Sequence, residues 1–354
     1  MRTDFEHNEA EVRSFFTTMY ERQLIWYKRF ILKLPRDQWT SDSIFNKYRF
    51  TNVYRELDRA SQWLLYNIIL NTSTWLKYNN DYDNHINLIW KILFFRMINN
   101  PSIFINADAV PDYNDYDPNK FYDYVKKDIL ANGIVFHHNA YCSNSKLKIQ
   151  LDNNETVYFE NIADYTIRHA SISLHDNIPR IYEIMQQSFS NTNTDPYALM
   201  TFMSTNIVST GGFKAHEFYQ DLCYIKPYAH LELMAYDANS ATNAGNGSLS
   251  GTRMLFNNVH SRAEAVDAIY YLRDMSEDYL DKLHKELYQD TDGFYYVKWD
   301  PSTNQYIRDK FNFTLSQIEH WLCEYSKYKR YAIGDKKIHT RRYNDPKSSD
   351  GLIY

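Results

Sequence analysis

Hydrophobic positions recur at helical spacing through the first hundred residues. Between Glu9 and Leu32 they repeat every three or four positions and stop before Pro35, which predicts a long helix. An apolar run from Leu88 to Ile98 predicts another. A stripe at helical spacing predicts a third helix over residues 51–70, with its apolar positions at Val53, Leu57, Ala60, Leu64 and Ile68.

The pattern changes to alternation in the middle of the chain. Residues 146–151 and 156–159 alternate apolar and polar positions around an Asp-Asn-Asn turn, which predicts a β-hairpin inserted at about 133–175. Aromatic-rich strands are expected within 290–313. Residues 112–120, rich in Asp, Asn, Tyr and Pro, indicate a surface loop.

Further helices are expected after the hairpin. Two of them span residues 179–189 and 196–208. Thr314 and Gln317 have the spacing of a capping box, which predicts that the last long helix starts there and runs to Tyr331. The fold class is therefore mostly α, with small inserted β-hairpins.

Composition limits the class of protein. The chain has 354 residues, of which 44% are hydrophobic, so it can bury a sizeable core. We expect one domain over residues 1–343 and a flexible tail over 344–354. Three cysteines without close spacing, and no signal or membrane-spanning run, predict a soluble cytoplasmic protein, in an infected bacterium if the source is a phage. The net charge of −5 requires any nucleic-acid contact to be local.

Glycine is concentrated in two short segments. Five of the nine glycines lie within residues 211–251. They form the pair Gly211-Gly212 and the group of three at Gly245, Gly247 and Gly251. A glycine turn that leads into a helix offers free N–H groups to a phosphate, so the second segment suggests an anion-binding nest. The alternative for the first is a tight interhelical turn with a left-handed residue. A Walker motif is absent from the sequence, which argues against an intrinsic NTPase.

Two predicted helices carry charged faces. On the first, Arg55 and Asp58 lie opposite the apolar stripe, together with Thr51 and Gln62. On the last, one face contains Glu319, Cys323, Lys327 and Arg330. Such faces are usually solvated, and Arg55 with Asp58 can be a simple intrahelical ion pair. The twelve histidines have no metal-ligand spacing, so neither a metal nor a cofactor is expected.

Four ordered segments carry a family resemblance. They are residues 35–42 with 49–59, the hairpin 209–215 followed by Asp221-Leu222, the glycine segment 245–251, and the helix 319–330. Together they resemble the phage α-glutamyl/putrescinyl thymine pyrophosphorylases, a family related to the helical domain of 5-hydroxymethyluracil DNA kinases. The segment around Gly211 also resembles the helix-hairpin-helix of DNA repair glycosylases.

The resemblance implies a DNA-glycosylase-like fold and an activity on phage DNA. The expected enzyme replaces phosphate or pyrophosphate on phosphorylated 5-hydroxymethyluracil with an amine from an amino acid or polyamine. Its partners would be double-stranded DNA with modified thymine and, functionally, a DNA kinase, with no membrane. The base would be flipped out of the duplex.

The site residues follow from the same resemblance and from the chemistry required. The candidate catalytic residues are Arg55, Asp58, Glu319, Glu324 and Lys327. The candidate phosphate ligands are Arg49, Asn52, Arg330, Gly245, Gly247 and Ser248. The candidate DNA contacts are Gly211, Gly212 and Lys214.

Two further expectations complete the hypothesis. The first and last motifs should meet across one cleft, since their polar faces have matching charges. The alternative function is a non-catalytic or base-excising DNA-binding protein on a glycosylase-like scaffold, in which Asp237 would be the activating carboxylate.

Overall fold

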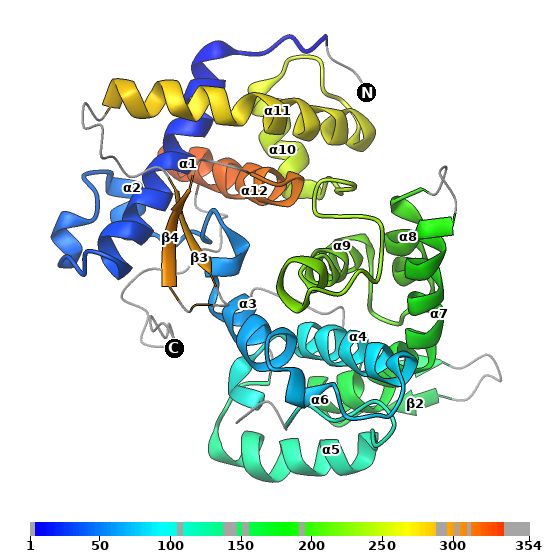
Figure 1. Cartoon of the computed structure of the whole chain (residues 1–354). Coiled ribbons are helices and arrows are strands. Elements are labelled where there is room, and N and C mark those ends of the chain that lie inside the picture. Colours follow the sequence, from blue (N-terminus) through cyan, green and yellow to red (C-terminus); the bar gives the residue numbers. More distant parts are fainter. Residues whose placement is uncertain are drawn as a thin grey trace. The chain divides into compact units, whose positions relative to one another are not determined.

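The structure is a computed structural model, and its described part is mostly helical, as predicted (Figure 1). The contacts within the chain group it into two compact units, residues 1–61 with 241–354 and residues 62–240. The structure describes residues 4–104, 109–136, 147–150, 156–190, 195–287, 296–300, 303, 305–309 and 313–335.

The first unit is built around helix α12 (Leu315–Ala332). It packs against α1, α10 and α11, which come from both ends of the sequence (Figure 1). The other elements of this unit are α1 (Glu9–Phe30), α2 (Ser43–Lys47), α10 (Asn246–Leu255), α11 (Arg262–Leu287) and the antiparallel strands β3 (Tyr296–Asp300) and β4 (Gln305–Asp309). The short α3 (Arg59–Leu64) crosses from this unit into the next.

Aromatic packing joins α1 to α12 in the core of the first unit. The ring of Phe15 meets that of Tyr325 edge-on at 5.5 Å, and the indole N–H of Trp321 donates to the Phe15 carbonyl oxygen at 3.3 Å. All three side chains are almost completely buried. Burying one such side chain contributes about 1.5–3 kcal/mol, so the contact fixes α12 firmly against α1.

The second unit is built around α4 (Asp81–Ile98), a helix buried on nearly all sides. It packs against α7 and α9, and α8 packs against both of these. The further elements are α5 (Pro118–Tyr124), α6 (Ile162–Tyr165), α7 (Ser171–Ser190), α8 (Tyr197–Asn206), α9 (Gly212–Leu222) and the strands β1 (Lys148–Gln150) and β2 (Thr156–Tyr158).

A buried ion pair joins α4 to α9. The Arg96 guanidinium donates to both carboxylate oxygens of Asp221 and also to Asn99 Oδ1 at 2.8 Å. Both charged side chains are at most 2% exposed. Because a buried charge is tolerated only when it is paired and hydrogen-bonded, this contact fixes the relative position of α4 and α9.

Several predicted elements are confirmed. Helix α1 ends at Phe30, two residues before the expected end, and α12 starts after Thr314 with the predicted capping box. Strands β1 and β2 pair in antiparallel register, with Ile149 opposite Val157. Strands are also present within 290–313. The predicted tail over 344–354 lies outside the described residues.

Other predicted bounds are wrong. The structure has no helix over residues 51–58 beyond one 3-10 turn, and helix begins only at Arg59. Helix α4 starts at Asp81 rather than Leu88. Pro179, expected at a helix start, lies inside α7, and α5 starts within the predicted loop, at Pro118. The helices α6 and α7 also occupy part of the predicted β-hairpin insertion.

Candidate functional site

Side-chain hydrogen bonds hold residues 50–58, the segment before α3, in a conformation that is not α-helical. Arg22 of α1 donates to the Phe50 carbonyl oxygen at 3.1 Å and to Asn52 Oδ1 at 2.6 Å. The Asn52 amide nitrogen in turn donates to Asp58 Oδ1 at 2.9 Å and to the Leu57 carbonyl oxygen at 2.9 Å. Asn52 therefore closes a loop around Asp58, and its amide group is committed to this role.

Asp58 is the carboxylate at the centre of this loop. Burial raises the pKa of Asp58 to about 6, although the Asn52 N–H and the nearby charges of Arg22, His320 and Arg55 all favour its ionised form. Desolvation therefore outweighs the hydrogen bond and the cationic neighbours. A carboxylate with a pKa near 6 is suited to accept a proton close to neutral pH.

The same segment contacts the middle of α12. The Thr51 backbone N–H donates to Glu324 Oε2 at 3.3 Å, and Lys327 Nζ donates to Glu324 Oε1 at 2.6 Å. Burial opposes the charge of Lys327, but Glu324 outweighs it and raises the pKa of Lys327. Glu324 is thus a buried carboxylate that joins the two motifs and is paired with a cation.

A second set of contacts joins the motifs near the start of α12. Gln317 Nε2 donates to Glu56 Oε2 at 3.2 Å, and the ring of Tyr54 stacks on that of Phe313 at 4.9 Å. The first and last motifs therefore contact each other as predicted, whereas a cleft between them stays a prediction. The prediction that the first motif is a helix is wrong, so Thr51, Arg55 and Asp58 do not form a line along one helix face.

The glycine segment has a packing role. Gly245 is the N-cap of α10, so Asn246-Gly247-Ser248 is a helical turn and not the predicted nest. A Cβ on Gly247 would come within 2.7 Å of Cys323 Sγ, and one on Gly251 would collide with the Leu322 carbonyl oxygen. The two glycines, four residues apart on one face of α10, therefore allow its backbone to approach α12 closely.

Glu319 lies beside the N-terminus of α10. Its Oε1 is 3.8 Å from the position that a Cβ on Gly245 would take. A carboxylate near a helix N-terminus is stabilised by the helix dipole, and α10 provides such an N-terminus beside Glu319. Ser248 is completely buried and its hydroxyl donates to the Gly245 carbonyl oxygen at 3.2 Å. The Ser248 hydroxyl is thus buried and bonded within the first turn of α10, and phosphate binding by this segment stays a prediction.

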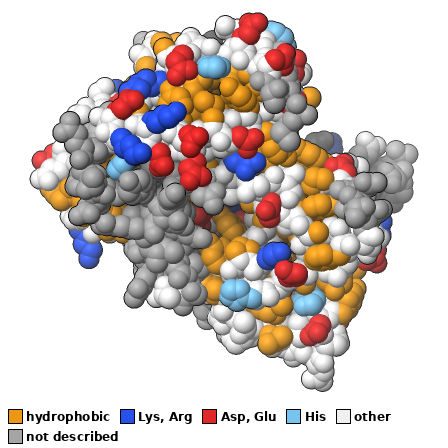
Figure 2. All heavy atoms as spheres, turned by 45° about the horizontal axis from the view of Figure 1, so that its top comes forward, with side chains coloured by type: hydrophobic (Ala, Val, Ile, Leu, Met, Phe, Trp, Pro, Cys, Tyr) orange, Lys and Arg blue, Asp and Glu red, His pale blue; other side chains and the backbone are white. Residues whose placement is uncertain are grey.

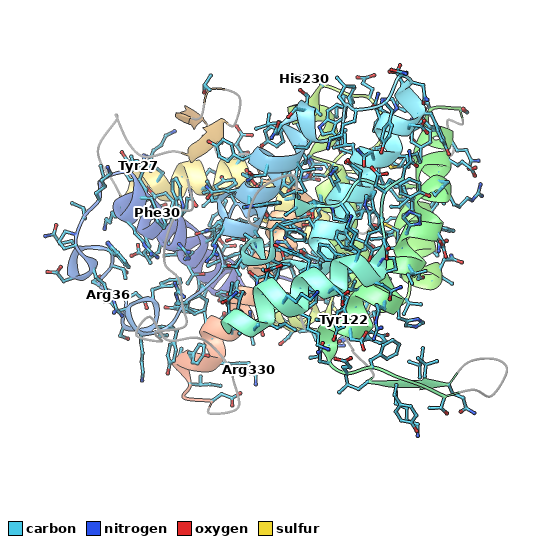
Figure 3. The ribbon with its side chains drawn as sticks, turned by 90° about the horizontal axis from the view of Figure 1, so that it is seen from below. Tyr27, Phe30, Arg36, Tyr122, His230 and Arg330 are labelled. Carbon is cyan, nitrogen blue, oxygen red and sulfur yellow. The ribbon has the colours of Figure 1, made fainter. Side chains whose placement is uncertain are left out.

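Two predicted phosphate ligands, Arg330 and Arg49, lie along the chain from the contacts of Glu324. Arg330 is in the last turn of α12 (Figure 3), and its Nε donates to Asp335 Oδ2 at 2.9 Å. It is six residues beyond Glu324, about 9 Å along the helix axis. Arg49 is half-buried and precedes the contact between Thr51 and Glu324 by two residues.

The predicted DNA contacts belong to the second unit. Gly211 is the N-cap of α9, and a Cβ on it would meet nothing within 4 Å. The left-handed residue of the turn is Ser209, with φ 62°, and not a glycine. Lys214 is 8% exposed, and burial lowers its pKa to about 8. The Thr210 hydroxyl is buried and has no hydrogen-bond partner among the described residues.

The sequence did not identify two residues of the Asp58 environment. Arg22 lies in the middle of α1, where its spacing gives no signal. His320 follows Glu319 directly and its charge acts on Asp58, yet on a predicted helix it falls beside the charged face and not within it. The described residues contain no group of three or more His, Cys, Asp or Glu side chains placed to hold a metal ion.

Among the described helices, none is both long and apolar enough to cross a membrane.

Comparison with known proteins gives two matches. The sequence model of the family described as "5-hmdU DNA kinase, helical domain" matches residues 9–338. The 5-hmdU DNA kinase of Bacillus phage SP10 is 22% identical over 363 residues, which cover 99% of this chain and 50% of that relative. The chain thus spans about half the length of the curated relative it matches. No solved structure gives a significant match.

Proposed function

The chain belongs to the family of the 5-hmdU DNA kinase helical domain, and we propose that it is an enzyme of thymine hypermodification in phage DNA. Its substrate would be phosphorylated 5-hydroxymethyluracil in DNA, on which it would replace phosphate or pyrophosphate with an amine. The family match supports the base and the DNA. The choice of amine transfer is supported by the resemblance of the four ordered sequence motifs to the thymine pyrophosphorylases.

The reaction has two electrostatic requirements. The amine nitrogen forms a bond to the exocyclic methylene carbon at position 5, while the carbon–oxygen bond breaks and the phosphate leaves with the electron pair. The attacking ammonium must first lose a proton to a base, and the leaving group must be balanced by positive charge. The base must also be out of the duplex stack for the amine to reach it.

The observation that carries the proposal is the environment of Asp58. It is a carboxylate with a raised pKa, placed where the two family motifs meet, and Arg55 and His320 act on its charge. Asp58 would accept the proton from the ammonium, and Arg55 would stabilise the departing phosphate. Glu324 is bound to Thr51 and Lys327, so it would hold the site together and keep Lys327 charged.

DNA binding would depend on local contacts. On the face in Figure 2, Lys and Arg side chains are mixed with Asp and Glu and form no single basic field among the described residues. In a glycosylase-like hairpin, the backbone N–H groups of Gly211 and Gly212 and the Lys214 ammonium would bind a DNA phosphate. The surroundings of Gly211 support this role. Neither its φ nor packing within the chain requires a glycine there, so the glycine is available for the close approach of a ligand.

The test is a transfer assay. Duplex DNA with phosphorylated or pyrophosphorylated 5-hydroxymethyluracil is incubated with the protein and a panel of amino acids and polyamines, and the digested nucleosides are read by mass spectrometry. We expect an amine adduct that Asp58→Asn lowers by about a hundredfold or more. Asp278→Asn, an exposed carboxylate on α11, is the matched control and should keep full activity.

Arg55 needs a separate variant because it is 4% exposed and its loss would also disturb the fold. Arg55→Lys keeps the charge but changes the geometry, and we expect it to lower turnover with a smaller loss of stability. An absence of adduct with every amine and both leaving groups would refute the transferase. If the unmodified protein still binds this DNA, the non-catalytic DNA-binding alternative then stands.

A further inference from the structure

Cations gather in one part of the first unit, where α1 ends and α2 follows. Residues 28–47 contain five Lys or Arg and two Asp, whereas the whole chain has a net charge of −5. The five cations are Lys28 and Arg29 in the last turn of α1, Lys33 and Arg36 in the connection, and Lys47 at the end of α2. We call these five residues the basic surface, and each of them is exposed or half-buried.

Side-chain contacts hold the parts of the basic surface together. The Arg36 guanidinium, at the edge of the ribbon in Figure 3, donates to the Asn46 carbonyl oxygen at 2.7 Å, which places the connection beside Lys47. Arg29 Cζ lies 5.0 Å from the centre of the Trp39 ring, so the end of α1 also contacts the connection. The cations therefore belong to one surface and not to separate loops.

Part of this charge has an ordinary structural explanation. Lys28 and Arg29 lie in the last turn of α1, where the helix dipole stabilises a cation, and Arg36 makes its hydrogen bond to the backbone. Lys33 lies beyond the helix, and Lys47 ends a helix of only five residues, whose dipole is small. Both lysines are exposed, and among the described residues neither takes part in an ion pair.

The backbone of Lys33 supplies a second observation. Its φ is 52°, in the left-handed region that favours glycine or asparagine at the end of a helix. In the same turn the Leu34 N–H donates to the Lys28 carbonyl oxygen at 2.9 Å, as in a helix C-cap. A glycine would adopt this conformation with less strain, so the turn does not require a lysine and its ammonium is available for a contact outside the chain.

We propose that the basic surface binds the phosphate backbone of the duplex DNA that carries the modified base. Exposed ammonium and guanidinium groups complement phosphates, and such contacts supply most of the sequence-independent affinity for DNA. Membrane association usually uses one amphipathic helix with a broad apolar face, whereas these cations come from two helices and the connection between them. The assignment rests on the proposed function, since it takes DNA as the substrate.

The basic surface is continuous with the loop that Asn52 closes around Asp58. Three residues after Lys47, the Phe50 carbonyl oxygen accepts a hydrogen bond from Arg22, which also binds Asn52. DNA bound at Lys47 would therefore lie along the segment that leads to Asp58. The contacts to the backbone would fix the position of the duplex while the modified base is out of the stack.

The first experiment measures DNA binding without any transfer. A short fluorescein-labelled duplex with unmodified thymine is titrated with the whole chain over a series of salt concentrations, and the anisotropy is read. The double variant Lys33→Gly, Lys47→Gln removes both exposed ammonium groups, so the slope of log affinity against log salt should fall in magnitude by about two. The matched control Lys120→Gln, Lys127→Gln removes two exposed lysines of the second unit and should keep the original slope.

Two further measurements exclude a folding effect. Lys33→Gly alone should leave the free energy of unfolding nearly unchanged, because relief of strain at a φ of 52° offsets the greater freedom of glycine in the unfolded chain. Asp37→Lys replaces the exposed carboxylate next to Arg36 with an ammonium, and should raise the affinity and increase the slope by about one. A misfolded chain would not show this gain. Asp278→Lys, the same charge change on α11, is its control and should keep the original slope.

The outcomes separate the two proposals. The basic surface is overturned if the double variant keeps the original salt slope, if the lysine control lowers the slope as much, or if Asp37→Lys has no more effect than Asp278→Lys. Binding of the chain to phosphatidylserine–phosphatidylcholine vesicles, but not to the duplex, would also overturn it. A lower slope in the double variant, with no transfer of any amine by the unmodified chain, would support the surface and count against the proposed reaction. Transfer by the double variant with an unchanged KM for DNA would support the reaction and overturn the surface.

Discussion

Replacing Gly251 by Ala is the sharpest structural test of how α10 meets α12. A Cβ at this position would overlap the Leu322 carbonyl oxygen and would lie 2.9 Å from the Leu322 carbonyl carbon. Cβ atoms essentially never come within 3.0 Å of such neighbours. Because the obstacle is the backbone of a buried helix, it cannot rotate away, and the two helices must separate.

Two opposing terms set the size of the effect. Overpacking a tight contact typically costs about 1–3 kcal/mol, with larger values where the obstacle is rigid. Replacing glycine by alanine inside a helix contributes about 1 kcal/mol in the opposite direction. Since the obstacle is backbone, we expect the upper end of the first range and a net destabilisation of about 2 kcal/mol.

The assay is denaturant unfolding with Gly211→Ala as the control. Gly211 has an ordinary φ and open space around it, so its alanine variant should change stability by less than about 1 kcal/mol, the usual limit for an N-cap glycine. Gly251→Ala should also lower transfer activity, because α10 places Gly245 beside Glu319. An unchanged or increased stability of Gly251→Ala would refute the close contact.

Three other predictions follow. Arg96→Met should destabilise the protein by about 3–5 kcal/mol because it leaves Asp221 buried without its cation, and adding Asp221→Leu should recover much of the loss in a double-mutant cycle read by unfolding. The pKa of Asp58 rises from 3.8 to about 6 on folding, so its protonated form contributes stability that is complete below pH 3.8 and lost as pH rises through about 6. The free energy of unfolding of Asp58→Asn, measured across pH 4–7, should not show this loss. If the free energy of unfolding of the variant falls with pH in parallel with that of the unmodified chain, the prediction is contradicted. Lys214→Gln should weaken DNA binding and reduce the salt slope by about one, measured by fluorescence anisotropy, and an unchanged slope would exclude Lys214 as a phosphate contact.

The sequence predicted the elements that depend on local signals. The capping box of Thr314 and Gln317 defines the start of α12, and apolar spacing alone predicts α1 within two residues. Helix α7 extended through Pro179 because a proline removes only one N–H donor, and packing of the surrounding helix on α4 and α8 compensates for it.

The error over residues 51–58 has a long-range cause. The apolar stripe is real, since Val53 and Leu57 are both buried. The backbone nevertheless forms no α-helix there, because Asn52 binds Asp58 and is itself held by Arg22, thirty residues earlier. Asn and Asp side chains compete with helical hydrogen bonds in this way, and a periodicity count cannot show which partner a distant helix supplies.

The glycines of α10 illustrate the limit of a motif taken alone. A Gly-x-x-x-Gly spacing is compatible with a phosphate-binding loop and also with two helices in close contact. Only the atoms that a Cβ on each glycine would contact distinguish the two cases. In this chain both neighbours belong to α12. The glycines therefore serve the site indirectly, because they bring the helix that carries Glu319 against the N-terminus of α10.

The half-buried Asp58 of the first motif and the buried Glu324 of α12 have environments suited to different tasks. Glu324 accepts the Thr51 backbone N–H and the Lys327 ammonium, so both of its oxygens are committed to contacts that join the two motifs. Asp58 also has favourable neighbours, but burial outweighs them and leaves its pKa near 6. A carboxylate whose pKa is raised to near neutral, and whose oxygens are not both committed to structural contacts, is the better candidate for acid–base work. Of the four charged residues that the sequence placed on α12, we therefore expect Glu324 and Lys327 to support the site, while the proton would pass to Asp58 of the first motif.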